Sequence, residues 1–233
     1  MNSKINKSCS YEIQPFEMKN IPLILEVVVP MWSMAAWEDN YKQFNVEYII
    51  RNNYFENDLH FQLVEKNSAD NKTCNEPHER EFCSMAFFAR KTDVCKTEEW
   101  FESESKKFTQ DLINSSRMSK TYIELMDEKV RAFMNDDDIQ LTLYVSRKKG
   151  CGSMLLNELC RQLYKQGYKN LYLWTDCDCD WEWYIKHGFE LVSKEAYEPF
   201  SSKDEDYNTY IFRKEIKCFE AQENLYNNCE VKL

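Results

Sequence analysis

The sequence predicts a mixed α/β domain, and three observations support this fold class. Apolar and polar residues alternate over 139–145, which is the pattern of a half-buried strand. A glycine-containing turn follows, and residues 154–163 then show the apolar spacing of an amphipathic helix. Hydrophobic residues make up 43% of the 233 positions, which allows a sizeable core and excludes intrinsic disorder of the whole chain.

The N-terminal elements are expected to be short. Residues 11–16 alternate weakly and predict a strand, and residues 23–29 predict a helix. Asn20 suits the N-cap of this helix, and Pro22 suits its first turn. Pro30 is expected to end or kink the helix, because proline lacks an amide hydrogen.

A second helix and a hairpin are expected next. Asp39 suits the N-cap of the helix. Its apolar face is marked at helical spacing by Tyr41, Phe44, Tyr48 and Phe55. Residues 59–63 and the apolar run 82–89 predict two strands. The segment 66–81 between them has no large apolar side chain and predicts a long loop.

The rest of the chain alternates between helical and strand patterns. Residues 96–133 predict one broken helix or two helices. After the strand and helix already described, the predicted elements are a strand over 170–174, a short helix over 181–186, and strands over 189–192 and 207–212. Glycines at 167 and 188 are expected to end the two helices, because glycine accepts the left-handed conformation found at helix C-termini. No repeat or Gly/Ser linker divides the chain, so we predict a single domain over 1–233.

Composition excludes several classes of function. The chain has 40 acidic and 30 basic residues and a formal charge of -10, which opposes binding to the phosphate backbone of nucleic acids. No signal-peptide pattern and no apolar run of membrane-spanning length occurs, so we expect a cytoplasmic protein with no membrane partner. The ten cysteines form no C-x-x-C pair and there are only three histidines, so we expect free thiols and no metal.

The segment 146–153 (SRKKGCGS) carries the clearest chemical signal. The chain has only four glycines, and Gly150 and Gly152 lie here between a strand and a helix. Such a turn brings free backbone amides and the positive end of the helix dipole to one point, which binds anions. Further donors are Arg147, Lys148, Lys149 and Ser153. The sequence patterns of nucleotide-binding loops are absent, and a tight turn with a solvated basic surface is the alternative.

The run 138–192 resembles the core of the GNAT acyltransferase superfamily. The pyrophosphate loop of that family has the pattern Q/R-x-x-G-x-G/A, which RKKGCG at 147–152 matches. The family also has a later Tyr followed by Gly-Phe at the end of a short helix, matched here by Tyr184 and by Gly188 with Phe189.

The resemblance implies a particular form of the α/β fold. The central sheet would be mixed and mostly antiparallel, with helices flanking it. One parallel pair of strands, here 139–145 and 170–174, would splay apart around the site. Residues 96–135 would be a helical insertion before the cofactor-binding strand.

The resemblance also implies acetyl-CoA, or another acyl-CoA, as co-substrate. The residues expected to bind it are Leu143, Tyr144, Val145, Arg147, Lys148, Lys149, Gly150, Cys151, Gly152 and Ser153. A primary amine would attack the thioester directly, and a backbone amide on the strand would stabilise the developing oxyanion. Tyr184 would act as the general acid for the departing thiolate. The family's Asn contact to the cofactor has no counterpart, because the segment before Tyr184 reads CDCD at 177–180.

The resulting hypothesis is an N-acetyltransferase that modifies a small-molecule or peptide amine. A catalytically silent module that binds acyl-CoA is the alternative, and a domain that binds no CoA is a third possibility. No general base is identified, although Asp138, Gln140 and Thr142 lie near the right strand. The insertion is expected to present a solvated face, with a substrate lid or a homodimer surface as the other interpretations.

Several side chains near the expected site have two interpretations. The acids Asp176, Asp178, Asp180 and Glu182 would attract a cationic amine or would cap the helix that follows. The tryptophans Trp174, Trp181 and Trp183 would wall a pocket or pack in the core. His187 suits the C-terminus of a helix, with catalysis as the other interpretation.

Overall fold

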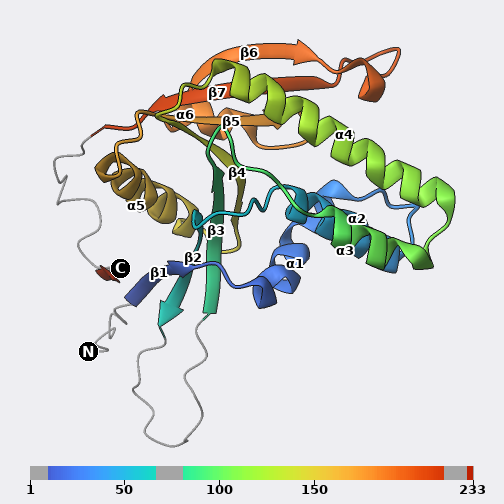
Figure 1. The fold of residues 1–233 in the computed structure, drawn as a ribbon, viewed down its shortest axis with the longest axis horizontal. Coiled ribbons are helices and arrows are strands. Elements are labelled where there is room, and N and C mark those ends of the chain that lie inside the picture. Colours follow the sequence, from blue (N-terminus) through green and yellow to red (C-terminus); the bar gives the residue numbers. More distant parts are fainter. Residues whose placement is uncertain (1–9, 67–80, 218–229, 233) are drawn as a thin grey trace, which may run out of the picture.

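The computed structural model describes residues 10–66, 81–217 and 230–232. Within these residues one sheet of eight strands forms the centre of the molecule (Figure 1). Its strands in chain order are β1 (Ser10–Pro15), β2 (His60–Lys66), β3 (Glu81–Ala89), β4 (Asp138–Ser146), β5 (Asn170–Asp176), β6 (Glu190–Ala196), β7 (Asn208–Glu215) and β8 (Glu230–Lys232). In space their order is β6-β7-β5-β4-β3-β2-β1-β8.

The sheet is mixed. Strands β4 and β5 run parallel, as do β1 and β8, and the other neighbouring strands run antiparallel. The prediction of a mostly antiparallel sheet with a central parallel pair is therefore confirmed. The hairpin predicted over 59–89 is formed by β2 and β3. The loop predicted over 66–81 falls almost entirely outside the described residues.

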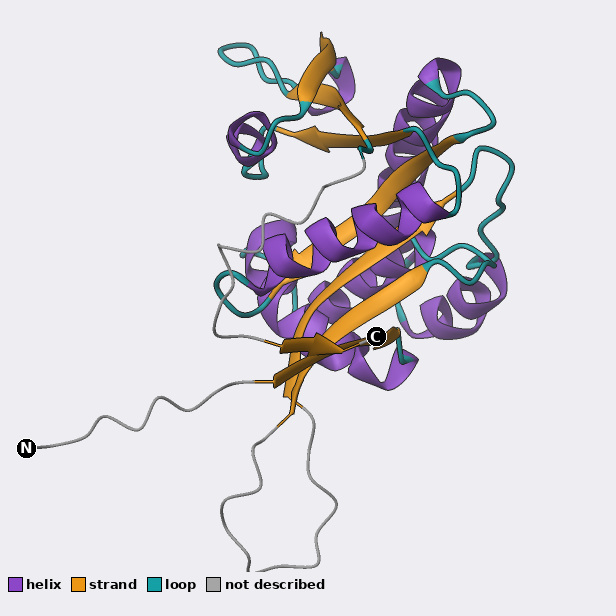
Figure 2. Ribbon diagram, turned by 90° about the vertical axis from the view of Figure 1, so that its left-hand side faces the viewer, coloured by secondary structure: helices purple, strands orange, loops and turns teal. Residues whose placement is uncertain are grey.

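Helices cover both faces of the sheet. Among the described residues the α-helices are α1 (Ile21–Trp32), α2 (Asp39–Asn52), α3 (Glu98–Glu104), α4 (Gln110–Phe133), α5 (Cys151–Lys165) and α6 (Trp181–Lys186). Helix α5 lies on one face, and α1, α2 and α4 lie on the other (Figures 1 and 2). The region 96–133 forms two helices, α3 and α4, joined by a 3-10 turn over Ser105–Lys107.

The first helix differs from its prediction at both ends. Asn20 precedes α1, but its side chain makes no capping hydrogen bond and instead donates from Nδ2 to Gln62 Oε1 at 2.7 Å. Pro30 lies inside the helix, which ends two residues later at Trp32. The second helix includes Asp39 in its first turn, and its N-cap is Glu38. The partner of Asn20 lies on β2, which local sequence patterns do not reveal.

Apolar cores fill the space between sheet and helices on both faces. On one face, Leu155 and Leu159 of α5 pack with Phe88 and Ile139. On the other face, Ile24 of α1 belongs to a core that also contains Phe87 of β3. Strand β3 therefore buries successive residues on opposite faces, as a strand covered by helices on both sides must.

Helix α4, the longer helix of the insertion, contacts both the sheet and the neighbouring helices. One of its faces packs against the strands, where Tyr122 and Met126 share a core with Tyr172 of β5. Its N-terminal half packs with α2 and α3 around a cluster of aromatic rings, which includes Phe44 and Phe101. Both contacts hold the insertion against the body of the molecule.

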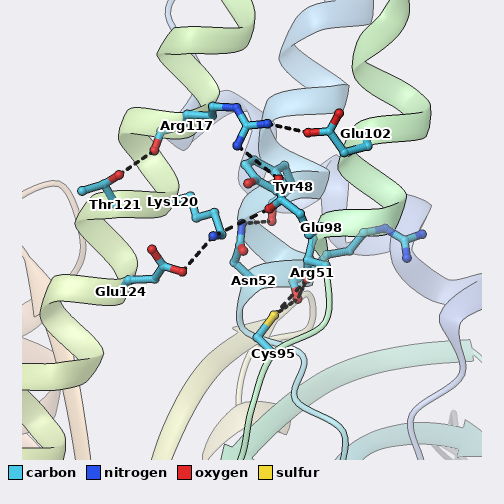
Figure 3. A network of polar contacts seen from close by, with 11 residues as sticks. Tyr48, Arg51, Asn52, Cys95, Glu98, Glu102, Arg117, Lys120, Thr121 and Glu124 are labelled. Carbon is cyan, nitrogen blue, oxygen red and sulfur yellow. Dashed lines mark hydrogen bonds and ion pairs between the residues drawn. The ribbon is translucent and has the colours of Figure 1, made fainter.

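The surface of this three-helix contact carries a network of ion pairs (Figure 3). Arg117 of α4 pairs with Glu98 at 3.1 Å and Glu102 at 2.5 Å, both on α3. Lys120 pairs with Glu124 at 2.8 Å. Solvent-exposed pairs of this kind stabilise a fold by about 0–1 kcal/mol each, so the buried aromatic cluster is the main stabilising contact. No helix among the described residues has the length and apolar character needed to span a bilayer.

Candidate active site

The parallel strands β4 and β5 separate shortly after they begin. They pair at Asp138 opposite Asn170, Ile139 opposite Leu171 and Gln140 opposite Tyr172. Beyond these positions the two strands line a cavity of about 1150 Å³, from Leu141 to Ser146 on β4 and from Leu173 to Asp176 on β5. The splayed pair is thus present at the position that the resemblance implied.

Asp138 holds the two strands together at the closed end of the splay. Its side chain is fully buried and accepts hydrogen bonds from Asn170 Nδ2 at 2.7 Å and from the amide of Asn135 at 2.8 Å. The other side chains considered near this strand are also engaged. Gln140 Nε2 donates to Asp127 at 2.6 Å, and the Thr142 hydroxyl donates to the carbonyl of Asn53 at 2.7 Å. Asp138 and Gln140 do not line the cavity, so neither is a candidate base.

Both glycines of the turn after β4 have a physical reason to be glycine. Gly150 is the N-cap of α5 and has a φ of 85°, the left-handed conformation that side chains disfavour. Gly152 lies in the first turn of α5, where a Cβ would be 2.4 Å from the hydroxyl of Tyr144 and 3.0 Å from Cβ of Ser146. The backbone therefore passes close to its neighbours here.

Several amides of this turn are free. The amide of Gly152 donates to Ser146 Oγ at 3.1 Å, and that of Cys151 donates to the carbonyl of Lys148 at 3.1 Å. Among the described residues, no acceptor contacts the amides of Lys149, Gly150 and Ser153. All three residues line the cavity at the N-terminus of α5. Free amides at a helix N-terminus form a site for an anion.

All residues expected to bind the co-substrate line the cavity except Arg147 and Cys151. The guanidinium of Arg147 pairs with Glu26 of α1 at 2.9 Å. Cys151 turns into the core beneath α5 and is 2% exposed. Lys148 lines the cavity while pairing with Glu65, whereas Lys149 has no ion-pair partner among the described residues. Lys149 is therefore the loop cation best placed to meet a ligand.

Tyr184 lines the same cavity from α6. Its ring packs against Phe212 and Phe189, with ring centroids 5.6 and 5.3 Å away. Its hydroxyl has no hydrogen-bond partner among the described residues, and burial raises the pKa of the phenol above its ordinary value. Tyr184 is thus a protonated, unengaged donor beside the splay.

Three of the four acids near the site line the cavity, namely Asp176, Asp178 and Asp180. Glu182 does not, and pairs with Lys186 at 3.1 Å. Asp180 occupies the N-cap position of α6, as the capping interpretation expected, but its side chain makes no capping hydrogen bond.

Asp176 is the most enclosed of the three and is 8% exposed. It accepts hydrogen bonds from the Tyr122 hydroxyl at 3.1 Å and from the amide of Asp178 at 3.2 Å, and Tyr207 lies beside it. Burial is the main reason that its pKa lies above the ordinary value of 3.8. This carboxylate therefore faces the cavity from a largely dry position.

The aromatic side chains divide between the two interpretations. Trp174 and Trp183 line the cavity, and the indole of Trp174 also donates to Asp127 at 2.9 Å. Trp181 stacks on Tyr210 at a centroid distance of 4.7 Å and does not line it. His187 is exposed and stacks on the outer side of the site, against Trp183.

The sequence patterns did not identify one wall of the cavity. This wall is formed by the end of α1, the N-terminal half of α4 and the segment before β7. Its large side chains include Met31, Trp32, Met34, Met118, Phe200 and Tyr207. Helical spacing in α4 was visible from the sequence, but it does not tell which surface a helix meets.

No group of three or more His, Cys, Asp or Glu side chains arranged to hold a metal ion occurs in the part of the chain that the structure describes. The site consists instead of free amides, a phenol, carboxylates and aromatic walls. Such a set can bind an anion at one place and a cation at another.

Comparison with known proteins gives similarity at the level of structure. No protein-family model and no curated protein matches the sequence. Among solved structures, the C-terminal condensation domain of Ebony, in complex with beta-alanyl-dopamine, is 10% identical, with 88% of this chain and 98% of that chain covered and a TM-score of 0.50.

Two further solved structures are N-acetyltransferases. The ribosomal-protein-S18-alanine N-acetyltransferase from Escherichia coli is 16% identical, with 93% and 99% of the two chains covered and a TM-score of 0.45. Arylalkylamine N-acetyltransferase 2 from Aedes aegypti is 13% identical, with 89% and 99% covered and a TM-score of 0.46. At such identities the likeness concerns the fold alone.

Proposed function

We propose that this chain, which has the fold of the GNAT superfamily, is an N-acetyltransferase that moves an acetyl group from acetyl-CoA directly to a primary amine. The observation that carries the proposal is the cavity between β4 and β5, because free amides at the N-terminus of α5 and the phenol of Tyr184 both face it. One feature suits a diphosphate and the other suits a departing thiolate.

The residues of the chain fit the co-substrate. Free amides at Lys149, Gly150 and Ser153 would hold the diphosphate, together with the ammonium group of Lys149. The absence of a side chain at Gly152 lets this turn pack closely against Tyr144 and Ser146, where a Cβ would clash. Leu143 and Val145 lie on the part of β4 that has no partner on the β5 side, so its backbone groups are available to an extended amide-containing chain.

Each chemical role then belongs to a group in the wall. The thioester supplies an activated carbonyl carbon, which the neutral amine attacks. A C–N bond forms and the C–S bond breaks, while a free backbone amide of β4 stabilises the developing negative charge on oxygen. The thiolate takes the proton of the Tyr184 hydroxyl, and the proton that the nitrogen loses returns to Tyr184 through solvent. The raised pKa of this phenol keeps it protonated near neutral pH, as a proton donor requires.

Two measurements test the proposal. Calorimetry measures acetyl-CoA binding, and free-thiol release is followed over a panel of primary amines. We expect Tyr184→Phe to lower kcat by about 100-fold or more while acetyl-CoA binds as before. Tyr164→Phe is the matched control, because Tyr164 is exposed on α5 away from the cavity. No heat from acetyl-CoA would exclude the proposed function.

A catalytically silent acyl-CoA-binding module is the second candidate. One observation favours it, namely that Asp138, Gln140 and Thr142 each make a side-chain hydrogen bond within the fold. Acetyl-CoA binding without thiol release for any amine would support this candidate. If thiol is released and the rate is unchanged in Tyr184→Phe, Tyr184 has no part in catalysis.

A further inference from the structure

The cavity has two chemically different ends. Its wall includes the N-terminus of α5 on one face of the sheet, and α1 and α4 on the other face. We call the α1 and α4 side the acceptor pocket. It is defined by Met31, Trp32, Met34, Met118, Phe200 and Tyr207.

Charges are segregated between these ends. The basic side chains in the wall are those of Lys148 and Lys149, both in the turn before α5. The acidic ones are Asp176, Asp178 and Asp180, all at or after the end of β5. An anionic co-substrate is thus favoured at the turn, and a cationic group is favoured beside the end of β5.

Apolar surface dominates the acceptor pocket. Met31, Met34 and Met118 are more than half exposed at its mouth, although they are large apolar side chains. Methionine adapts its shape to the ligand it meets and packs favourably against aromatic rings. Trp32, Phe200 and Tyr207 add flat ring surfaces, which suit an aromatic or otherwise apolar ligand body.

Asp176 is placed to receive a positive charge within this apolar setting. Helix α4 contributes the Tyr122 hydroxyl to it, and the segment before β7 contributes Tyr207. An ionised carboxylate has about four acceptor positions, so these bonds orient it without using all of them. The titratable groups around it are Tyr122, Tyr207, Asp178 and Cys179. None of these groups is a cation, so a bound ammonium group would be the first charge to compensate it.

We propose that the acceptor is a primary monoamine with an apolar, aromatic body. Its ammonium group binds the Asp176 carboxylate and loses one proton to solvent before the neutral amine attacks, and its body packs in the acceptor pocket. This assignment rests on the proposed function, because it names the second substrate of the same site. It also gives Asp176 a role as the specificity-determining residue and gives α4 a direct part in substrate binding.

The experiment measures phenethylamine binding by titration calorimetry to the full chain saturated with coenzyme A. Phenethyl alcohol has the same ring without the charge, and spermidine has the charge without the ring. We expect phenethylamine to bind at least about tenfold more tightly than either. Tighter binding of spermidine, or equal binding of the alcohol, would overturn the proposal.

Variants then locate the charge. Asp176→Asn is expected to weaken phenethylamine binding by about 30-fold or more and to leave the alcohol unaffected, which also reports that the pocket is intact. Met118→Lys adds a cation at an exposed position and should weaken phenethylamine binding by about 2- to 5-fold. Glu182→Gln is the matched control outside the cavity, and both ligands should bind as in the parent chain. Equal losses for amine and alcohol in Asp176→Asn, with no effect of Met118→Lys, would contradict the assignment.

Failure of this inference is distinguishable from failure of the proposed function. Thiol release with spermidine or a peptide amine, but not with phenethylamine, would overturn the acceptor class and leave the acetyltransferase intact. Absence of coenzyme A binding would exclude the acetyltransferase. Titration of phenethylamine into the free protein would then still show whether the pocket takes an apolar monoamine.

Discussion

At Gly152 a single methyl group is enough to disturb the turn between β4 and α5. The residue lies in the first turn of α5, and its φ is not in the left-handed region. Its glycine requirement comes instead from Tyr144, whose hydroxyl would lie 2.4 Å from an added Cβ. Gly150 differs, because there the backbone conformation itself requires glycine while open space surrounds it. Gly150 is therefore required by its backbone conformation, and Gly152 by the close packing around it.

Gly152→Ala is expected to weaken acetyl-CoA binding by about tenfold, because overpacking displaces Tyr144 or the start of α5. Adding Tyr144→Phe removes the hydroxyl at 2.4 Å and leaves the ring carbon at 3.0 Å. The double variant should therefore recover part of the affinity. Calorimetry with acetyl-CoA checks both values, and a double variant no better than Gly152→Ala would contradict the steric explanation.

At the scale of elements, the site depends on where β4 and β5 stop pairing. Asp138 fixes the closed end, because its carboxylate holds both the turn before β4, through Asn135, and the start of β5, through Asn170. The splay that follows opens the cavity, and α4 closes one side of it. A structural carboxylate and the candidate active-site cavity therefore lie at opposite ends of the same strand pair.

Asp138→Ala is expected to lower the free energy of unfolding by about 2–4 kcal/mol, because it leaves the amide of Asn135 and the side-chain amide of Asn170 without their acceptor. Asp137→Ala is the matched control, since the Asp137 carboxylate makes only a solvent-exposed ion pair with Lys169, which contributes little to stability. Urea unfolding measures both variants. Equal losses would show that Asp138 is not the main link between the strands.

At the scale of the whole molecule, a buried carboxyl group links the helical insertion to the sheet. Asp127 of α4 is 6% exposed and accepts hydrogen bonds at Oδ1 from Gln140 of β4 and Trp174 of β5. Burial raises the pKa of Asp127 above 3.8, more than these donors and nearby Arg131 lower it. Folding therefore makes the Asp127 carboxyl easier to protonate than it is in the unfolded chain.

The direction of this pKa shift determines how the stability of the folded chain depends on pH. A raised folded-state pKa adds stability that is fully present below about pH 3.8 and is lost as the pH rises through the folded-state pKa. An asparagine at 127 keeps an oxygen for both donors and carries no charge. Asp127→Asn should therefore be more stable than the parent chain near pH 7, with the difference shrinking toward about pH 4.

Urea unfolding at both pH values tests this prediction. Asp136→Asn is the control, because Asp136 is exposed in the turn between α4 and β4. Its replacement should leave the pH dependence of stability unchanged. A variant at position 127 that is less stable than the parent chain near pH 7 would show that the charged form is the one the fold prefers.

The sequence by itself determined the parts of this protein that depend on neighbours in the chain. The alternation over 139–145, the turn with Gly150 and Gly152, and the amphipathic helix after it are short-range patterns, and the structure contains β4, the turn and α5 in these places. The resemblance carried by the same residues also anticipated the splayed pair and placed Tyr184 beside it.

Only the tertiary structure decided what faces the other side of the cavity. Its walls come from α1, α4 and the segment before β7, which lie far apart in the chain and meet only after the sheet has formed. The same holds for single side chains, since Asn20 finds its partner on β2 and Asp176 finds Tyr122 on α4. Periodicity shows that a helix has an apolar face, but the surface that this face meets depends on contacts between distant segments. For that reason the turn between β4 and α5 was predictable from the sequence, whereas the wall formed by α1 and α4 was not.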